Sequence, residues 1–513
     1  MPAAKRRSLS RENRPDLLAI AVPVLVGALL CALELNTRSL WLDEGATFGI
    51  TSQHGAALWH GIKNDGGNML LYYLLIHAVG VVFGHAAWVM RLPSLLAIAA
   101  TGGLVAAIGL RLLRDRRQAV ASGLLTVISL PLVFWGQDAR GYALMLALAT
   151  ASMLAFIVIL DGSPSRAAPV AFVLSTVAAL YFGYDAGLLI LVQLAVLPLF
   201  RDRARLVIGS LVVVALLCFP LLVLALDRGS GQLFWVPPLS GSVLGETLMT
   251  LLSAGMPPNF HENAGSVATE IISGLLMIAA VTLAVRAGRR LRLLVAWLLI
   301  PAVVGLAVSA AGKPIELARC SILLMPALSL LLVWLLARAT LPRGAGVAAF
   351  AVLIALRVLQ IVPSYGTSPE DWKAATAAVL TGTASQPACI AFYPQDGREV
   401  FDYYLERSTR PRLDSDATQR LTPVLPTLEW GTVKPFVEQY RTLNGGPLAA
   451  VEQRCAVLYL LASHVGQSSG PAVSRAHLAR YDQLLGALAK AYPQQDSRKF
   501  GWAGPVYVER YSR

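Results

Sequence analysis

The segment LWLDE at positions 40–44 ends in two adjacent carboxylates, Asp43 and Glu44, soon after the first long apolar run, 17–36. Trp41, just before them, is a residue type enriched where a membrane meets water. Ionisable residues at a membrane edge are costly, so their presence there needs a reason. Two interpretations are open: the pair lies in a solvated loop that ends a helix, or it belongs to a functional site. The rest of the chain favours the second.

Composition predicts a polytopic membrane protein. The chain has 513 residues, of which 56% are hydrophobic and 14% charged, against about 25% charged in soluble proteins. Its mean hydropathy is +0.60. The net charge of +13 is uneven, because residues 1–363 hold 27 Lys and Arg against 16 Asp and Glu, whereas residues 364–513 hold 16 against 14. Since no basic block is interleaved with aromatic residues, we expect no nucleic-acid partner.

Eleven apolar runs approach the roughly 20 residues that a membrane-spanning helix needs. The run 186–200 is the short one, with fifteen residues. The sequence therefore predicts an all-α membrane domain over 17–363 with about eleven transmembrane helices. The predicted spans are 17–36, 91–113, 119–136, 142–160, 167–183, 186–200, 206–226, 267–285, 293–311, 320–337 and 345–363.

Basic residues predict the orientation of these spans, because short loops rich in Lys and Arg stay cytoplasmic. The N-terminus and alternate loops carry nineteen basic residues, and the opposite loops carry seven. We therefore expect a cytoplasmic segment 1–16 and an extracytoplasmic segment 364–513. The seven on the outer side are Arg38, Lys63, Arg91, Arg140, Arg228, Lys313 and Arg319.

The apolar run 69–83 is ambiguous on length alone. If it crossed the membrane, the basic cluster 111–117 and every later cluster would change sides. We therefore predict that 69–83 lies on or dips into the interface. The first outer loop, 37–90, is then long and partly membrane-embedded, which makes it the natural floor of a site.

Residues 364–513 are predicted to form a small α/β domain. Helical periodicity fits 369–381, 397–407, 433–442 and 474–492, and strand-like runs fit 388–393, 455–461 and 505–510. Cys389 and Cys455 each open one of the apolar runs or lie beside it. In an oxidising compartment they could form a disulfide, and two buried free thiols are the alternative.

The unusual polar residues collect on the predicted outer face. Asp43 and Glu44 follow the first span, Asp138 and Arg140 join the third and fourth, and Lys313 and Arg319 flank the tenth. A carboxylate can take a proton from an attacking hydroxyl. Arg and Lys can hold a phosphate and stabilise it as a leaving group. The set predicts acid–base chemistry on a phosphate-bearing lipid, although Arg140 and Arg319 taken singly could also be interface anchors.

Five segments resemble glycosyltransferases of the C superfamily (GT-C). The resemblance is strongest to the bacterial branch related to protein O-mannosyltransferases and to the lipid A aminoarabinose transferase, and it covers most of 17–375. The segments are LWLDEGATFGI at 40–50, LLYYLLIHAVGVVFGHAAWVMRLPS at 70–94, QDARGYAL at 137–144, GKPIELARCSILLMPAL at 312–328 and EDWKAA at 370–375.

The resemblance implies a role for each residue that matches a motif. Asp43 would be the catalytic base, Glu44 would set its geometry, and Asp138 would be the second acidic residue of the site. The donor phosphate would be bound by four residues, namely Arg140, Tyr142, Lys313 and Arg319.

Two departures from the family pattern leave the sugar and acceptor preference open. Gly67-Asn68-Met69 stands where the family often has His-Pro-Pro, and Cys320 stands where a Tyr often follows the Arg. We take Asn68, Tyr72, His261 and Glu262 as candidates for the acceptor or sugar pocket. His261 and Glu262 alone are too few to hold a metal and could equally be ordinary loop residues.

The resemblance implies an inverting glycosyltransferase of the bacterial inner membrane. It would move a sugar from a polyprenyl-phosphate donor to a hydroxyl of a cell-envelope glycan, lipid or protein outside the membrane. The sequence requires no cofactor and leaves a divalent cation open. Two other classes remain: a flippase or transporter for polyprenyl-linked glycans, and a non-catalytic scaffold. A transporter would favour paired half-repeats with broken helices at the midplane, whereas the charges here collect at one edge.

Overall fold

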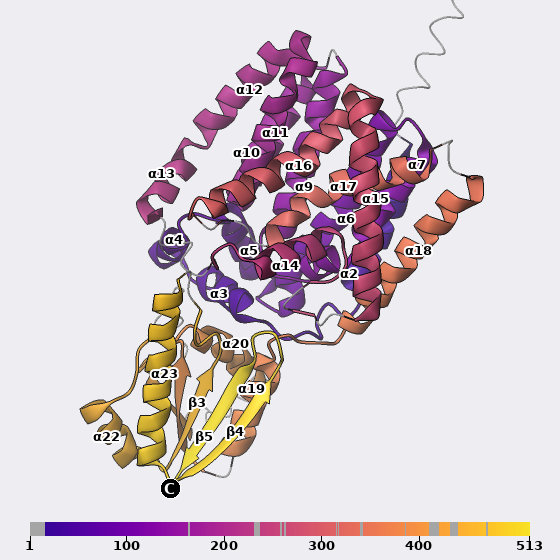
Figure 1. Cartoon of the computed structure of the whole chain (residues 1–513). Coiled ribbons are helices and arrows are strands. Elements are labelled where there is room, and N and C mark those ends of the chain that lie inside the picture. Colours follow the sequence, from indigo (N-terminus) through magenta and orange to yellow (C-terminus); the bar gives the residue numbers. More distant parts are fainter. Residues whose placement is uncertain are drawn as a thin grey trace, which may run out of the picture.

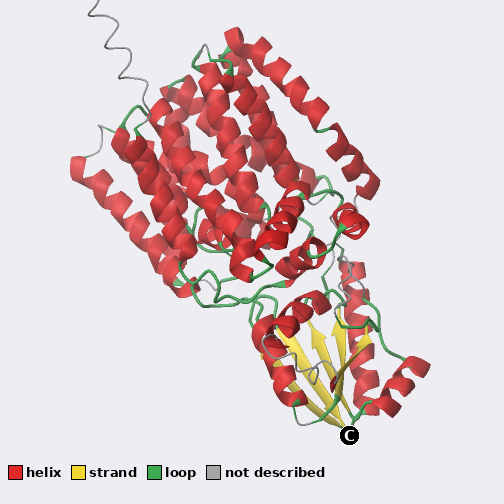
Figure 2. Ribbon diagram, turned by 180° about the vertical axis from the view of Figure 1, so that it is seen from behind, coloured by secondary structure: helices red, strands yellow, loops and turns green. Residues whose placement is uncertain are grey.

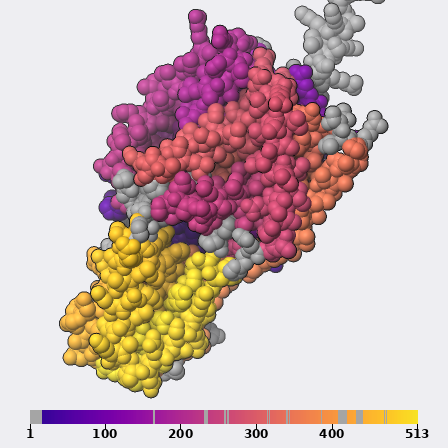
Figure 3. Space-filling view, viewed as in Figure 1, coloured from indigo at the N-terminus to yellow at the C-terminus, as the bar shows by residue number. Residues whose placement is uncertain are grey.

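The computed structural model describes residues 16–162, 165–229, 236–256, 259–260, 263–313, 315, 318–338, 342–384, 386–409, 420–430, 440–467 and 470–513. It shows a large helical body that carries a small α/β domain at one end (Figure 1, Figure 2). The C-terminal domain, orange to yellow in the space-filling view, sits against that end of the body (Figure 3). Nearly all of the predicted cytoplasmic segment 1–16 lies outside the described residues.

The helical body follows the predicted apolar runs closely. Every one of the eleven runs falls on helix, with breaks inside several of them. The α-helices of the body are α2 (Leu17–Ala32), α3 (Leu42–Thr51), α4 (Gly55–Asn64), α5 (Leu70–Phe83), α6 (Ala87–Leu112), α7 (Arg116–Val127), α8 (Leu130–Gly136), α9 (Tyr142–Leu160), α10 (Ala167–Phe182), α11 (Leu188–Val196), α12 (Ala204–Leu217), α13 (Phe219–Arg228), α14 (Gly241–Leu251), α15 (Ala264–Ala287), α16 (Arg289–Ala310), α17 (Met325–Leu336) and α18 (Arg343–Ile361).

The predicted count of eleven spans is not confirmed. Among the described residues six helices are long and apolar enough to cross a membrane, or up to eight if two bent helix pairs each count as one span. Prolines explain two of the breaks, because a proline is tolerated in the first turn of a helix but not in its interior, where it lacks the backbone N–H and clashes with the preceding turn. The run 119–136 breaks shortly before Pro131, where α7 and α8 meet at 67°. The run 206–226 breaks at Cys218, just before Pro220.

Burial separates central helices from peripheral ones. Helices α9 and α17 are mostly buried, whereas α15 and α18 leave most of their apolar side chains exposed. Ile271, Leu275 and Ile278 on α15, for example, are more than half exposed. Apolar surface of this extent marks an interaction with another apolar phase. Together with the length of the helices, it identifies a multi-pass membrane protein.

Ion pairs gather the predicted inner loops at the end of the body away from the C-terminal domain. Arg116 at the start of α7 pairs with Asp16 before α2, with 2.8 Å between Nε and Oδ2. Arg290 at the start of α16 reaches Asp161 after α9 at 3.0 Å, and Arg111 at the end of α6 faces the same carboxylate. These ion pairs bring the ends of α2, α6, α7, α9 and α16 together on one side of the body, which is compatible with the predicted common side.

Helix α5 covers the ambiguous run 69–83. With 14 residues it is shorter than a span needs. It packs against α3, α6 and α10, and it leaves Val81, Val82 and Phe83 exposed at its far end. An interfacial position for α5 stays a prediction, and this geometry is compatible with it.

The C-terminal domain is a five-stranded mixed sheet flanked by helices. The strand order is β2-β1-β3-β5-β4, with β1 parallel to β2 and β3, and β5 antiparallel to β3 and β4. The elements are α19 (Trp372–Thr383), β1 (Ala388–Tyr393), α20 (Gly397–Thr409), β2 (Leu421–Leu425), α22 (Gly445–Arg454), β3 (Val457–Ala462), α23 (Pro471–Ala491), β4 (Gln494–Phe500) and β5 (Val506–Ser512).

Sequence patterns predicted six of these nine elements and missed β2, β4 and α22. Strand β4, QQDSRKF, is a polar edge strand, and β2 contains Pro423, so neither shows an apolar alternation. The predicted helix 433–442 falls mostly outside the described residues, and residues 440–442 are not helical. Cys389 in β1 forms a disulfide with Cys455, two residues before β3, which decides between the two alternatives left open above.

Candidate active site

Helix α3 presents Asp43 to two arginines. The helix begins at Leu42, so Asp43 lies in its first turn, where the helix dipole favours a negative charge. Asp43 Oδ2 is 3.7 Å from Arg140 Nε and 3.5 Å from Arg319 Nη1. The Asp43 side chain is 31% exposed, so a substrate can reach it. Three residues far apart in the sequence therefore meet as predicted.

Tyrosines hold both guanidinium groups in place. Arg140 Nη1 donates to Tyr73 Oη at 3.1 Å. Arg319 Nη1 donates to Tyr142 Oη at 2.8 Å, and the Arg319 guanidinium lies 5.4 Å from the centre of the same ring. These contacts fix the two cations beside Asp43, as a phosphate site requires. Tyr142 thus lies where the resemblance implied, whereas Tyr73 was not predicted.

Glu44 points away from Asp43 and holds the segment next to Arg140 in place. Neighbouring helical residues diverge by about 100°. Glu44 is fully buried and makes a two-pronged ion pair with Arg91, with 2.7 Å from Nε to Oε1 and 2.6 Å from Nη2 to Oε2. Its Oε1 also accepts the Ala139 N–H at 2.8 Å, and Thr47 Oγ1 donates to the Ala139 carbonyl at 3.0 Å. Helix α3 thereby positions the residue next to Arg140.

Asp138 is buried and accepts a hydrogen bond from the residue that precedes α3. Its Oδ1 accepts the indole N–H of Trp41 at 2.7 Å, and Trp41 directly precedes the helix. Burial, reinforced by the negative charge of Glu44, raises the pKa of Asp138 to about 8. Asp138 thus holds Trp41, and none of its hydrogen bonds reaches Asp43.

The remaining predicted residues are dispersed. Lys313 is exposed after α16. Asn68 is half-buried in the turn before α5, and Tyr72 is buried with its hydroxyl towards the Met90 carbonyl. His261 and Glu262 lie outside the described residues.

The sequence did not predict two residues behind Arg140, namely Tyr73 and Asp65, which we call the second layer of the site. Tyr73 Oη donates to Asp65 Oδ2 at 2.8 Å, and burial raises the pKa of Asp65 to about 6 although Arg140 opposes the shift. Asp65 opens a tight turn in which Gly66 and Gly67 have φ values of 63° and 72°, a backbone that favours glycine. The Asp-Gly-Gly sequence is a turn signal that could have drawn attention to Asp65.

The C-terminal domain reaches the start of α3 through Glu370. Glu370 Oε2 accepts the Leu42 N–H at 3.1 Å and the Trp372 indole N–H at 3.2 Å. Its other oxygen pairs with His464 Nε2 at 2.7 Å. Burial opposes the charged imidazole, but the Glu370 carboxylate outweighs it and raises the pKa of His464 to about 9. The domain thus helps to fix the helix that carries Asp43.

No metal centre is found in the described part of the chain, where no three His, Cys, Asp or Glu side chains cluster closely enough to hold an ion. A hard divalent cation prefers a shell of oxygen ligands. The charged neighbours of Asp43 within 4 Å are two guanidinium groups instead.

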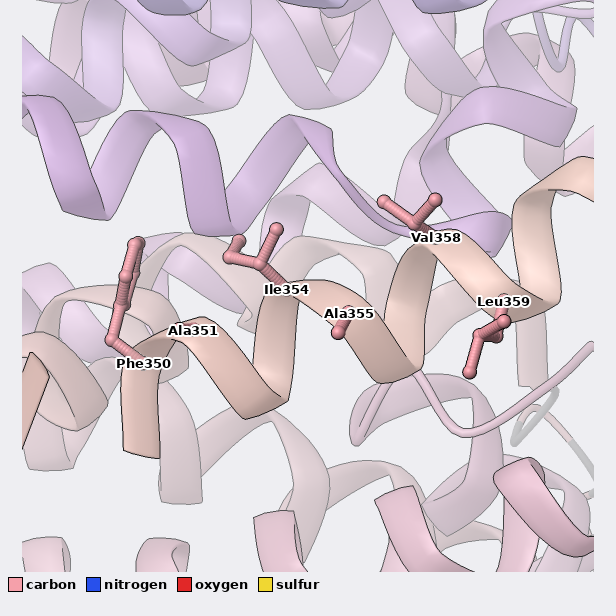
Figure 4. A pocket seen from close by; sticks show the side chains of 6 residues that line it. All are labelled: Phe350, Ala351, Ile354, Ala355, Val358 and Leu359. Carbon is pink, nitrogen blue, oxygen red and sulfur yellow. The ribbon is translucent and has the colours of Figure 1, made fainter. Parts of the chain in front are cut away.

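Two hollows lie apart from Asp43. One is a shallow apolar groove along α18, where Phe350, Ile354 and Val358 point to the same side (Figure 4). It contains no polar side chain, so it offers contact to acyl chains and no chemistry. The other, of about 250 Å³, lies where the body meets the C-terminal domain and is lined by residues that include Phe260 and Trp502.

Solved structures share this architecture. ArnT from Cupriavidus metallidurans bound to undecaprenyl phosphate matches with a TM-score of 0.52 and 15% identity over 96% of this chain and 97% of that one. The Archaeoglobus fulgidus oligosaccharyltransferase in complex with Zn and sulfate matches with 0.53 and 12% over 94% and 72%. The mycobacterial arabinofuranosyltransferase AftD matches with 0.51 and 15% over 98% of this chain and 40% of its own length.

These likenesses show that the chain has the GT-C fold, as the sequence resemblance implied. No known family profile and no curated protein sequence matches the chain.

Proposed function

We propose that the protein transfers one sugar, with inversion, from a polyprenyl-phosphate donor to an acceptor hydroxyl on the extracytoplasmic side of the membrane. The observation that carries this proposal is the contact of Asp43 with both Arg140 and Arg319. A proton acceptor beside two fixed cations is what transfer from a sugar phosphate needs.

The reaction is a single displacement. The acceptor oxygen forms a bond to the anomeric carbon while its proton passes to Asp43. The bond from that carbon to the phosphate oxygen breaks, and the electron pair leaves with the polyprenyl phosphate. Arg140 and Arg319 stabilise the negative charge that gathers there. Because the nucleophile and the leaving group occupy opposite faces of the sugar, the configuration inverts.

The donor class is supported by the fold. ArnT, which shares the fold along its whole length, is described bound to undecaprenyl phosphate. A lipid donor also suits a site at the edge of a membrane-spanning body. The acceptor would be a glycan, lipid or protein of the cell envelope. Since the charged neighbours of Asp43 are two guanidinium groups, we route no step through a divalent cation.

The orientation is supported by two independent features. Basic residues favour the cytoplasm for the end that carries Asp16, Asp161 and their arginines. The Cys389–Cys455 disulfide at the other end suits an oxidising, extracytoplasmic compartment. We therefore propose that in a bacterium the protein lies in the inner membrane with the site facing outward.

Turnover of radiolabelled polyprenyl-phosphate sugars by the purified protein tests the proposal. Asp43→Asn keeps the shape but removes the base, so turnover should fall by about 100-fold or more while undecaprenyl phosphate still binds. The matched control is Asp227→Asn, whose side chain is 70% exposed and which should retain full turnover. Transbilayer movement of the lipid without transfer would instead identify a flippase, and neither activity would indicate a scaffold.

A further inference from the structure

The sheet of the C-terminal domain has a topological switch point between β1 and β3. After β1 the chain passes through α20 to β2 on one side, and after β3 it passes through α23 to β4 and β5 on the other. In open sheets with parallel strands, ligands bind in the crevice beyond the carboxyl ends of the strands at such a point. Here the carboxyl end of β3 faces the helical body (Figure 1), and β1, which is parallel to β3, ends on the same side.

Asp396 and His464 follow the carboxyl ends of β1 and β3. Asp396 is 4% exposed, and its carboxylate lies beside its own N–H and that of Gly397 without a hydrogen bond of good geometry to any described donor. A buried carboxylate in that state costs free energy unless something completes its hydrogen bonds. His464 follows β3 with a left-handed φ of 51° and a side chain that is 26% exposed. Non-glycine residues in this conformation are uncommon and cluster at functional sites.

His464 is linked to the start of α3. Two hydrogen bonds through the Glu370 carboxylate connect the His464 imidazole to the N–H of Leu42, the residue before Asp43. The carboxyl end of β3 therefore lies close to the first turn of the helix that carries Asp43.

Helix α20 sits directly on α3. A Cβ atom at Gly45 would lie 2.2 Å from the Val400 side chain, and a Cβ atom at Gly49 would lie 2.7 Å from the Glu399 carboxyl. This close approach fixes the switch point relative to the helix that carries Asp43. The placement of the crevice is thus built into the fold.

We propose that Asp396 and His464 form the acceptor subsite and that the acceptor presents a sugar there. This inference rests on the proposed function and assigns the acceptor side of the same site. The Asp396 carboxylate offers two hydrogen-bond acceptors and the His464 imidazole offers a donor. Neighbouring hydroxyls of a sugar both donate and accept, so they satisfy both groups. A further hydroxyl can then lie against Asp43, while the arginines hold the donor phosphate.

Saturation-transfer NMR tests this subsite without requiring turnover. The protein is placed in lipid nanodiscs, free of sugar-based detergents, and is loaded with undecaprenyl phosphate. The probes are methyl glycosides of glucose, mannose and arabinose. We expect saturation transfer to at least one probe, reduced about tenfold by Asp396→Asn or His464→Gln through the loss of a hydrogen bond to a charged group. Asp482→Asn, exposed on α23, should leave the signal unchanged.

The subsite would be overturned if no glycoside shows saturation transfer, or if the NMR signal in Asp396→Asn equals that of the parent. It would also be overturned if the only Asp396-dependent signal came from a threonine peptide. Since Asn precedes a helix as well as Asp does, Asp396→Asn should keep the thermal stability of the parent, which guards against a folding artefact. If a glycoside binds through Asp396 but no labelled donor sugar is ever transferred, the subsite stands and the proposed transferase activity fails.

Discussion

Replacing Glu44 by Gln should destabilise the protein even though the shape is kept. Both members of the Glu44–Arg91 pair are fully buried. Removing one charge leaves the other uncompensated, which costs about 3–5 kcal/mol in similar buried pairs. Arg91 would keep its bonds to the carbonyls of Leu35, Arg38 and Ser39, so we expect the lower end, about 3 kcal/mol.

Arg91→Met should cost more, near the upper end of that range. It removes the donors to the three carbonyls and leaves the Glu44 carboxylate with only the Ala139 N–H. The double variant removes both charges, so its loss should fall short of the sum by about 2 kcal/mol, the coupling typical of residues in contact. Equilibrium unfolding by SDS in mixed micelles, followed by tryptophan fluorescence, measures all three changes in unfolding free energy.

The control for this cycle is Arg116→Met. Its ion pair with Asp16 is as short, at 2.8 Å, but the two side chains are 57% and 32% exposed. An exposed pair contributes about 0–1 kcal/mol, so this variant should stay close to the parent. The reasoning would be refuted if Glu44→Gln lowered the unfolding free energy no more than the control does. It would also be refuted if the losses of the two single variants simply added up in the double variant, because the buried pair would then not be coupled. Turnover per folded molecule should fall less in Glu44→Gln than in Asp43→Asn, because Glu44 positions the arginine loop rather than touching substrate.

Three further predictions concern the donor, pH and topology. Arg319→Lys keeps the charge but loses the planar fork, so undecaprenyl phosphate affinity should drop about tenfold, and an unchanged affinity would contradict the assignment. Glu370 raises the pKa of His464 from 6.5 to about 9, so the pair's contribution to the unfolding free energy is complete below pH 6.5 and lost as the pH rises through 9. His464→Gln should flatten the dependence of the unfolding free energy on pH in that window. An unaltered slope would count against the pairing. Single cysteines at positions 117 and 499, both exposed, should label from the cytoplasmic and the extracytoplasmic side respectively. Labelling of both from the same side would contradict the proposed topology.

Sequence patterns predicted the meeting of Asp43, Arg140 and Arg319 because charge is rare in apolar segments. Each of the three stands out at a predicted membrane edge, and the alternation of basic loops assigns all of them to one side. The helices were predictable for the same reason, since apolar runs of membrane length leave few alternatives. Hydropathy does not show where helices bend, so the number of spans could not be predicted from hydropathy alone, although Pro131 and Pro220 mark two of the breaks.

Apart from Asp65, whose Asp-Gly-Gly turn is a signal, the residues that support the site look ordinary in sequence. Tyr72 and Tyr73 are adjacent in an apolar helix, and only the rotation of α5 against its neighbours decides that Tyr73 reaches Arg140. Arg91 was counted with the outer basic residues at the edge of the span 91–113, yet it lies inside α6 as the buried partner of Glu44. The contribution of the C-terminal domain depends on the docking of α20 against α3, which no local pattern encodes.

The docking of α20 on Gly45 and Gly49 has a consequence for exchanging modules between enzymes of this fold. The two glycines lie in the same short helix as Asp43, so one segment must satisfy both the chemistry and the surface that receives Val400. A side chain at Gly45 would collide with Val400 and push α20 away, whereas one at Gly49 would displace the Glu399 carboxyl. A foreign C-terminal domain grafted onto this body would therefore have to bring a helix matched to those two positions. The unit of exchange is α3 together with α20, and the boundary drawn by hydropathy near residue 364 is the wrong place to cut.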